Sequence, residues 1–281
     1  MKFKIATAQY PLHFHSSWKD WEESTKTWVH QARDCQILVF PEYGSLDLTS
    51  LLKEEERTLG RQVFFLQKFL TPFLETFEKL AKEMGIYILA PSIPVYEKDK
   101  PVNRAFFFGP QGSLGFQDKI KMTRFEKEDW LIHSSPQGLT CFSTEMGPVG
   151  VCICYDVEFP QFAKYFSHSG AKILLAPSCT ETKHGLNRVH TGARARALEN
   201  QFIVAVASTV GEAPWSPAVD INSGQALVAG PSDLGFPEDG IITKGEFNKI
   251  GWIKTDLDLT LIEKVRQDGS VLNYQDSFSD F

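Results

Sequence analysis

Short runs of apolar residues, rich in β-branched side chains and ending in Pro, Ser or Gly, recur along the whole chain. Continuous apolar runs of this length are typical of strands that are covered on at least one face. They predict strands over residues 4–8, 35–40, 85–90, 104–108, 149–154, 171–176 and 202–208, with weaker candidates at 224–228 and 250–254.

Helical patterns separate these runs. Apolar residues recur at helical spacing over residues 17–33, 64–84, 159–169 and 188–200. Pro72 marks a kink or a boundary in the second segment, because proline cannot donate a backbone hydrogen bond. Strands that alternate with helices predict an α/β fold with functional sites at strand ends. No linker or low-complexity tract divides the chain, so we expect residues 1–281 to form a single domain.

Composition narrows the class of protein. The 281 residues are 42% hydrophobic and 23% charged, as in ordinary globular proteins. The net charge of −6 argues against a nucleic-acid partner, whose phosphates favour a basic surface. We find neither the apolar core of a signal peptide nor a run of about 18 apolar residues, the length that a membrane-spanning helix needs. The five scattered cysteines are typical of free thiols in a reducing compartment. We therefore expect a cytoplasmic protein that does not associate with membranes.

Cys154 is a candidate nucleophile. It stands where the apolar run that begins at Val149 meets a polar turn, and a helix is predicted from Phe159. A thiol at such a junction can be exposed beside backbone N–H groups, which lower its pKa or hold an oxyanion. The alternative is a small buried side chain at the end of a strand. A metal site with Cys152 would need a second pair of ligands at zinc spacing, which is missing, so we expect no metal.

Glu42 and Lys119 are candidate partners for the thiol. Glu42 follows a predicted strand directly, where burial beside apolar neighbours can raise its pKa and tune it as a general base. Lys119 lies beyond the turn at residues 109–112, and an inward ammonium there could stabilise an oxyanion. Alternatively, Glu42 is a solvated acid in a loop, and Lys119 belongs to a solvated, charged edge strand. A dyad of Cys179 with His184 or His190 also remains open.

The order and context of these residues resemble the nitrilase superfamily, whose members carry Glu, Lys and Cys in that order. The similarity lies in Phe-Pro-Glu42, Gln-Asp-Lys119-Ile-Lys-Met and Cys154-Tyr-Asp-Val-Glu-Phe-Pro. It extends from residues 6–9 to residues 251–256 and includes residues 194–200, so it covers nearly the whole chain. Two departures stand out: Lys121 replaces a common His, and residues 122–130 replace the usual Leu-Pro continuation that borders the pocket.

The resemblance implies a four-layer αββα sandwich, a homodimer and no cofactor. It implies that Glu42, Lys119 and Cys154 are catalytic, and that a fourth polar residue, a Glu, follows Lys119. Spacing favours Glu128 for this role, with Glu126 as the rival. The backbone N–H of Tyr155 is the expected second oxyanion donor.

The chain is thus expected to hydrolyse a small amide or carbamoyl compound through a thioester. Trp130, in the segment that borders the pocket in relatives, and Trp215, in a predicted loop, are expected to contact the substrate. Nitrile hydrolysis and thioester-based N-acyl transfer are the alternative reactions, since all three use a cysteine thioester.

Overall fold

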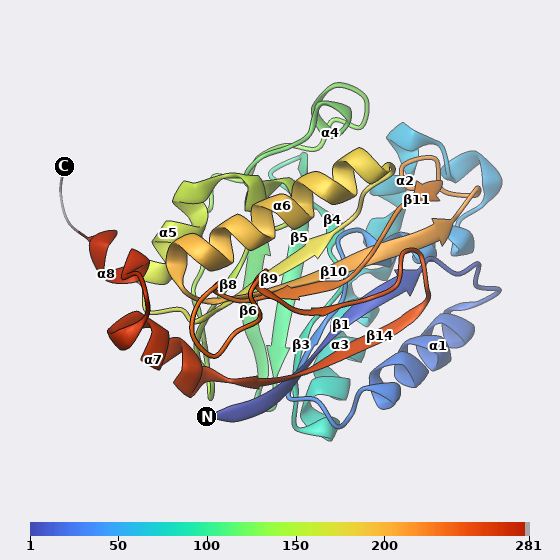
Figure 1. Cartoon of the computed structure of the whole chain (residues 1–281). Coiled ribbons are helices and arrows are strands. Elements are labelled where there is room, and N and C mark those ends of the chain that lie inside the picture. The colour runs from blue at the N-terminus through green and yellow to red at the C-terminus, as the bar shows by residue number, and fades with distance from the viewer. Residues whose placement is uncertain (279–281) are drawn as a thin grey trace.

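The computed structural model describes residues 1–278, and in this part of the chain fourteen strands form one hydrogen-bonded network (Figure 1). Its main path runs β4-β5-β3-β2-β1-β10-β9-β8-β7. The strands are β1 (Lys2–Pro11), β2 (Ile37–Val39), β3 (Tyr87–Leu89), β4 (Ile93–Glu97), β5 (Lys100–Gly109), β6 (Gly112–Asp118), β7 (Phe142–Thr144), β8 (Gly147–Val151), β9 (Ile173–Ser178), β10 (Ile203–Glu212), β11 (Ile221–Asn222), β12 (Leu227–Ala229), β13 (Ile241–Lys244) and β14 (Gly251–Asp258).

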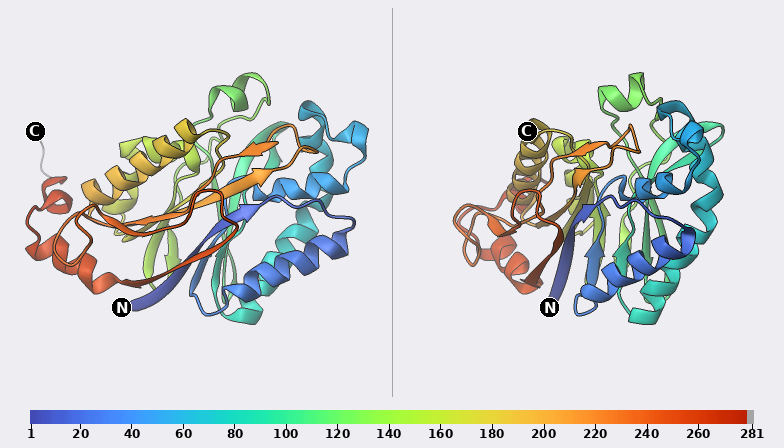
Figure 2. Two further views of the ribbon diagram at one scale, coloured as in Figure 1. Left: turned by 45° about the vertical axis from the view of Figure 1, so that its right-hand side comes forward. Right: turned by 90° about the vertical axis from the view of Figure 1, so that its right-hand side faces the viewer.

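The helices lie on the two outer sides of this network. Figure 2 shows α5, α6 and α7 on one side and α1, α2 and α3 on the other, with two layers of strands between them. The α-helices are α1 (Trp18–Gln31), α2 (Leu59–Leu66), α3 (Leu70–Met84), α4 (Arg124–Glu128), α5 (Pro160–His168), α6 (Lys183–Asn200), α7 (Leu259–Asp268) and α8 (Asn273–Asp276). Short 3₁₀ turns are η1 (Gly44–Leu51), η2 (Glu54–Glu56), η3 (Gln67–Phe69) and η4 (Cys154–Glu158). The predicted α/β fold with αββα layers is confirmed.

Alternation along each strand fills two cores. In β2, Ile37 and Val39 enter the core between the sheet layers, whereas Leu38 enters the core that α1 and α3 cover. The layers meet through Phe107 of β5 and Phe142 of β7, whose ring centroids are 5.3 Å apart. Because successive side chains of a strand point to opposite faces, one apolar strand can serve both cores.

The central strands β3, β2, β1, β10, β9 and β8 all pair in parallel, so their carboxyl ends lie at one edge of the sheet. The strand β6 is antiparallel to β5, which is antiparallel to β3, so β6 also ends at that edge. The loops after β2, β6, β8 and β9 therefore converge. This edge is where a site is expected in a sheet of this kind.

The main helices and strands of the prediction are present, several with shifted boundaries, and two of the differences have a clear physical meaning. The predicted helix at 64–84 is divided by η3, and Pro72 lies in the first turn of α3, where its missing N–H has no intrahelical partner to lose. The predicted strand at 149–154 ends at Val151, which leaves Cys154 on a turn. No helix in residues 1–278 combines the length and apolarity needed to cross a membrane.

Candidate active site

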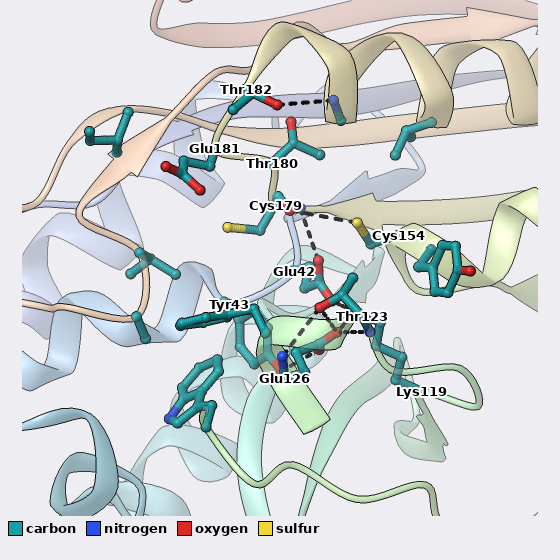
Figure 3. Close-up of a pocket in the computed structure, with 18 of the residues that line it drawn as sticks. Glu42, Tyr43, Lys119, Thr123, Glu126, Cys154, Cys179, Thr180, Glu181 and Thr182 are labelled. Atoms are coloured by element: carbon teal, nitrogen blue, oxygen red, sulfur yellow. Dashed lines mark hydrogen bonds and ion pairs between the residues drawn. The ribbon is translucent and has the colours of Figure 1, made fainter. Parts of the chain in front are cut away.

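Glu42 lies just after β2, and its side chain is buried at the convergent sheet edge (Figure 3). Its Oε1 accepts hydrogen bonds from Lys119 Nζ at 2.8 Å and from Asn103 Nδ2 at 2.9 Å. Its Oε2 accepts one from the backbone N–H of Cys179 at 3.0 Å. Donors from three other segments therefore hold the carboxylate in one orientation.

Lys119 follows β6 directly and is as deeply buried as Glu42. Its Nζ also donates to Glu126, at 2.7 Å to Oε1 and 2.6 Å to Oε2. The Tyr43 hydroxyl donates to Oε1 of Glu126 at 2.7 Å, and the backbone N–H and hydroxyl of Thr123 donate to its Oε2 at 2.8 and 2.9 Å. A buried ammonium is thus clamped between two buried carboxylates, the arrangement that buried charges require.

The fourth residue of this group is Glu126. Spacing favoured Glu128 for this place, but Glu128 does not lie there. The Glu128 side chain is 56% exposed and pairs with Arg124 at 2.9 Å on the surface of α4. Residues two apart on a helix point in different directions, so only one of the two can face Lys119. The sequence carried a usable signal: Thr123 and Glu126 have the spacing of a capping box, and the structure forms one.

Cys154 opens the turn η4, three residues beyond β8. Its φ of 50° lies in the left-handed region, and Tyr43, which follows Glu42, has a φ of 54°. Non-glycine residues in this region are strained by about 1–3 kcal/mol and cluster at functional sites. The buried Sγ donates to the carbonyl of Cys179 at 3.6 Å. One peptide segment thus contacts both Cys154 and Glu42.

Asp156, buried two residues after Cys154, connects the turn η4 to the Lys119 segment. Its carboxylate accepts from the backbone N–H of Ile120 at 3.1 Å and of Lys121 at 2.7 Å. From the sequence, Asp156 is expected to orient the nucleophile turn through backbone hydrogen bonds, and the backbone N–H groups that it binds belong to the Lys119 segment. The sequence pattern did not point to Asn103. These contacts join residues more than thirty positions apart, which local patterns do not reveal.

The pKa shifts differ among the four ionisable groups of the site, which are Cys154, Glu42, Lys119 and Glu126. Burial raises the pKa of the Cys154 thiol, and the nearby Glu42 carboxylate raises it further. Burial also raises the pKa of Glu42, against the opposing charge of Lys119. Burial disfavours the charged forms of Lys119 and Glu126, but their mutual attraction outweighs it, so the pKa of Lys119 is raised and that of Glu126 is lowered. Lys119 and Glu126 therefore stay charged, while Glu42 and Cys154 can exchange a proton.

These groups face a cavity of about 410 Å³, large enough for a small organic molecule. Tyr155 and Trp130 line it, and their contact with the substrate stays a prediction. The backbone N–H of Tyr155 lies in the first turn of η4, where a helix has no acceptor for it. Trp215 does not line the cavity; its ring packs against Phe14 with centroids 5.3 Å apart. The expectation that Trp215 contacts the substrate is therefore not matched by its position.

The alternative dyad at Cys179 is not formed. Its Sγ contacts Asn222 Oδ1 at 3.4 Å, the His190 ring bonds to the carbonyl of Gln225, and His184 lies outside the cavity lining. Within residues 1–278, three or more His, Cys, Asp or Glu side chains do not gather into a metal-binding group.

A buried Glu, Lys and Cys at one edge of an αββα sandwich is the arrangement that the resemblance to the nitrilase superfamily predicts for hydrolases of carbon–nitrogen bonds. The chain matches the carbon-nitrogen hydrolase family over residues 4–267, and it belongs to that family. It is an enzyme of the amidase/nitrilase type, in agreement with the resemblance drawn from the sequence motifs.

Among curated proteins, the chain is similar to the probable hydrolase YhcX of Bacillus subtilis, with 32% identity over 97% of this chain and 53% of that protein. The chain thus spans about half the length of that relative. It is also similar to omega-amidase NIT2-B of Xenopus laevis, with 31% identity over 69% of each chain.

Solved structures share the fold. A CN-hydrolase superfamily protein from Xanthomonas campestris superposes with a TM-score of 0.78, at 17% identity, over 100% of this chain and 99% of that one. An amidase from Nesterenkonia sp., seen with acrylamide added at its active-site cysteine, gives 0.67 at 18% identity over 95% and 97%.

Proposed function

We propose that this enzyme hydrolyses a linear amide through a covalent thioester on Cys154. The observation that carries the proposal is the shared burial of Glu42, Lys119 and Cys154 at one sheet edge, with the Cys179 peptide bonded to both Glu42 and Cys154. A base that faces a thiol beside a fixed cation is the arrangement that nucleophilic catalysis requires. The amide preference is supported by the amidase and omega-amidase relatives.

In the first half-reaction, Sγ of Cys154 attacks the amide carbon while Glu42 takes the thiol proton. The carbonyl oxygen becomes an oxyanion, which Lys119 Nζ and the N–H of Tyr155 stabilise. The C–N bond then breaks as Glu42 returns the proton to the leaving nitrogen, and ammonia or an amine departs. Burial raises the pKa of Glu42 and so makes it a stronger base toward the thiol than an ordinary carboxylate.

In the second half-reaction, water attacks the thioester carbon and Glu42 accepts its proton. The C–S bond breaks, the thiolate regains a proton from Glu42, and a carboxylic acid is released. Glu126 touches no reacting atom in this scheme. It is a positioning residue that keeps Lys119 charged and directed at the oxyanion, through the two hydrogen bonds between them.

The test is ammonia release from a panel of small amides, carbamoyl compounds and nitriles, with wild type and Cys154→Ala. We expect ammonia release from amides with wild type and none with the variant. In quenched wild-type reactions, the mass of Cys154 should increase by that of the acyl group less the one hydrogen that it replaces. Release from nitriles alone would replace amidase by nitrilase activity. Near-normal turnover by Cys154→Ala would refute the thioester scheme.

A further inference from the structure

The outer wall of the cavity is acidic. Beyond the buried group, the charged residues that line it are Glu158, Arg188, Glu181 and Asp220. Arg188 is neutralised by Glu158, with 3.2 Å between Nε and Oε1. Glu181 and Asp220 are exposed, and within residues 1–278 neither carboxylate has a cationic partner. Two carboxylates on this wall therefore lack a counter-ion.

The cations of the cavity are already occupied. Lys119 is bound by Glu42 and Glu126, and Arg188 by Glu158. An anionic substrate would therefore enter a cavity whose uncompensated charges have its own sign. Like charges in a partly desolvated site repel one another, so such a substrate is disfavoured.

The two free carboxylates stand on loops that are tied together. Glu181 lies between β9 and α6, and Asp220 precedes β11. Thr180 precedes Glu181, and Ser223 lies three residues after Asp220; two hydrogen bonds of 2.7 Å join them, from Ser223 N to the Thr180 carbonyl and from the Thr180 hydroxyl to the Ser223 carbonyl. Figure 3 shows Glu181 well separated from Lys119, beyond Cys179. The acidic wall is thus a positioned feature, apart from the reacting groups.

A second, independent feature of the cavity is aromatic. Tyr43, Phe125 and Trp130 line it, with ring centroids 4.7 Å apart for Tyr43 and Trp130 and 6.1 Å apart for Phe125 and Trp130. Aromatic faces attract cations, and aromatic rings are a known means of binding ammonium groups.

We propose that the substrate is a linear amide that carries a protonated amine at its far end. Its ammonium group lies against Asp220 and Glu181 while its amide carbon reaches Cys154. This inference rests on the amide hydrolysis proposed above, and it names the substrate class of the same site. The hydrolysis itself is unchanged, with ammonia leaving from the amide and the distal amine kept in the product.

The test compares three amides of the form X-(CH₂)₄-CONH₂ that differ only in X: 5-aminopentanamide, hexanamide and adipic acid monoamide, with their shorter homologues. We expect kcat/KM for the ammonium compound to exceed that for the neutral one at least about tenfold, in line with charge-pair energies near a surface. The anionic compound should be the poorest. Equal rates for the three, or preference for the anionic amide, would overturn the inference and leave amide hydrolysis by Cys154 standing.

Variants of Asp220 and Glu181 test whether these two carboxylates cause the preference for the ammonium amide. Asp220→Asn and Glu181→Gln should each lower kcat/KM for the ammonium amide severalfold and leave hexanamide within about twofold, since only the charge term is removed. Glu145→Gln is the matched control, because Glu145 is also exposed but does not line the cavity. An unchanged preference in the double variant Asp220→Asn/Glu181→Gln would contradict the assignment.

A binding assay tests the ammonium site independently of amide hydrolysis. Alkylation of Cys154 by iodoacetamide is followed by mass spectrometry with pentylammonium or pentanoate present. Protection by pentylammonium that Asp220→Asn/Glu181→Gln abolishes supports the ammonium site even if no tested amide is hydrolysed. Protection by pentanoate, or by neither ion, overturns it.

Discussion

Replacing Glu126 by Gln tests the charge arrangement behind the proposed mechanism. Both carboxylate oxygens of Glu126 act as hydrogen-bond acceptors. Oε1 accepts from Lys119 and Tyr43, and Oε2 accepts from Lys119 and Thr123. Gln has almost the same shape, but in either orientation its NH₂ group points at donor groups. The substitution therefore removes a charge and places a donor against donors, at a residue that is only 3% exposed.

The expected magnitude follows from what Lys119 loses. Removing one partner of a buried ion pair costs about 3–5 kcal/mol, because it leaves an incompletely compensated charge. Glu42 remains as a second partner at 2.8 Å, so the lower end, about 3 kcal/mol, is expected for the free energy of unfolding. Lys119 should then pair more closely with Glu42 and lower its pKa. A weaker base and a displaced oxyanion donor together predict a loss in kcat of about 10²–10³.

The assay combines urea unfolding with the pH dependence of kcat/KM on the best amide. Glu128→Gln is the matched control: the side chain is two residues away, exposed and paired only at the surface, so neither stability nor kcat should change measurably. We also expect the acidic limb of the pH profile to move to lower pH in Glu126→Gln, as the pKa of Glu42 falls. Wild-type turnover and stability in Glu126→Gln, or equal losses in both variants, would refute the reasoning.

Three further outcomes can be checked. In wild type, kcat/KM should rise with pH through a pKa above the ordinary 4.5 of glutamate, because buried Glu42 must be ionised to act as a base; a profile flat down to pH 4.5 would exclude it. Burial raises the pKa of Asp156 from 3.8 to about 7, so the carboxyl group binds its proton more tightly in the folded than in the unfolded state. Protonated Asp156 therefore contributes to stability below pH 3.8, and this contribution is lost as pH rises through about 7. Asp156→Asn should flatten the pH dependence of the free energy of unfolding in that window and lower kcat by displacing Lys119, and urea titrations that keep the wild-type slope would contradict this. In Gly192→Ala the new Cβ would lie 3.1 Å from the Val157 carbonyl oxygen, so helix α6 should push the turn η4 and reduce kcat with little effect on KM; unchanged kinetics would show that the turn adapts.

Local patterns were sufficient for much of the fold. The apolar runs that became β1, β2, β9 and β10 could be read directly, because continuous hydrophobicity suits strands buried on both faces. The helix α7 was missed, although Asp258 caps it and Leu259, Ile262 and Val265 are spaced on one face. The helical pattern of α7 is short, and the helix begins directly after the last residue of β14, so the pattern does not stand apart from that of the strand.

The sequence by itself determined which loops carry Glu42 and Cys154, since each directly follows an apolar run and parallel strands end at one edge of a sheet. The capping-box spacing of Thr123 and Glu126 distinguishes Glu126 from Glu128 in the sequence, but only the tertiary structure decided that Glu126 faces Lys119 and that Trp215 lies away from the cavity. The physical reason is the range of the interactions. Periodicity reports neighbours a few residues apart, whereas the bond between Lys119 and Glu42 joins residues 77 positions apart. Such a contact exists because the strands that precede these residues end at the same edge of one folded sheet.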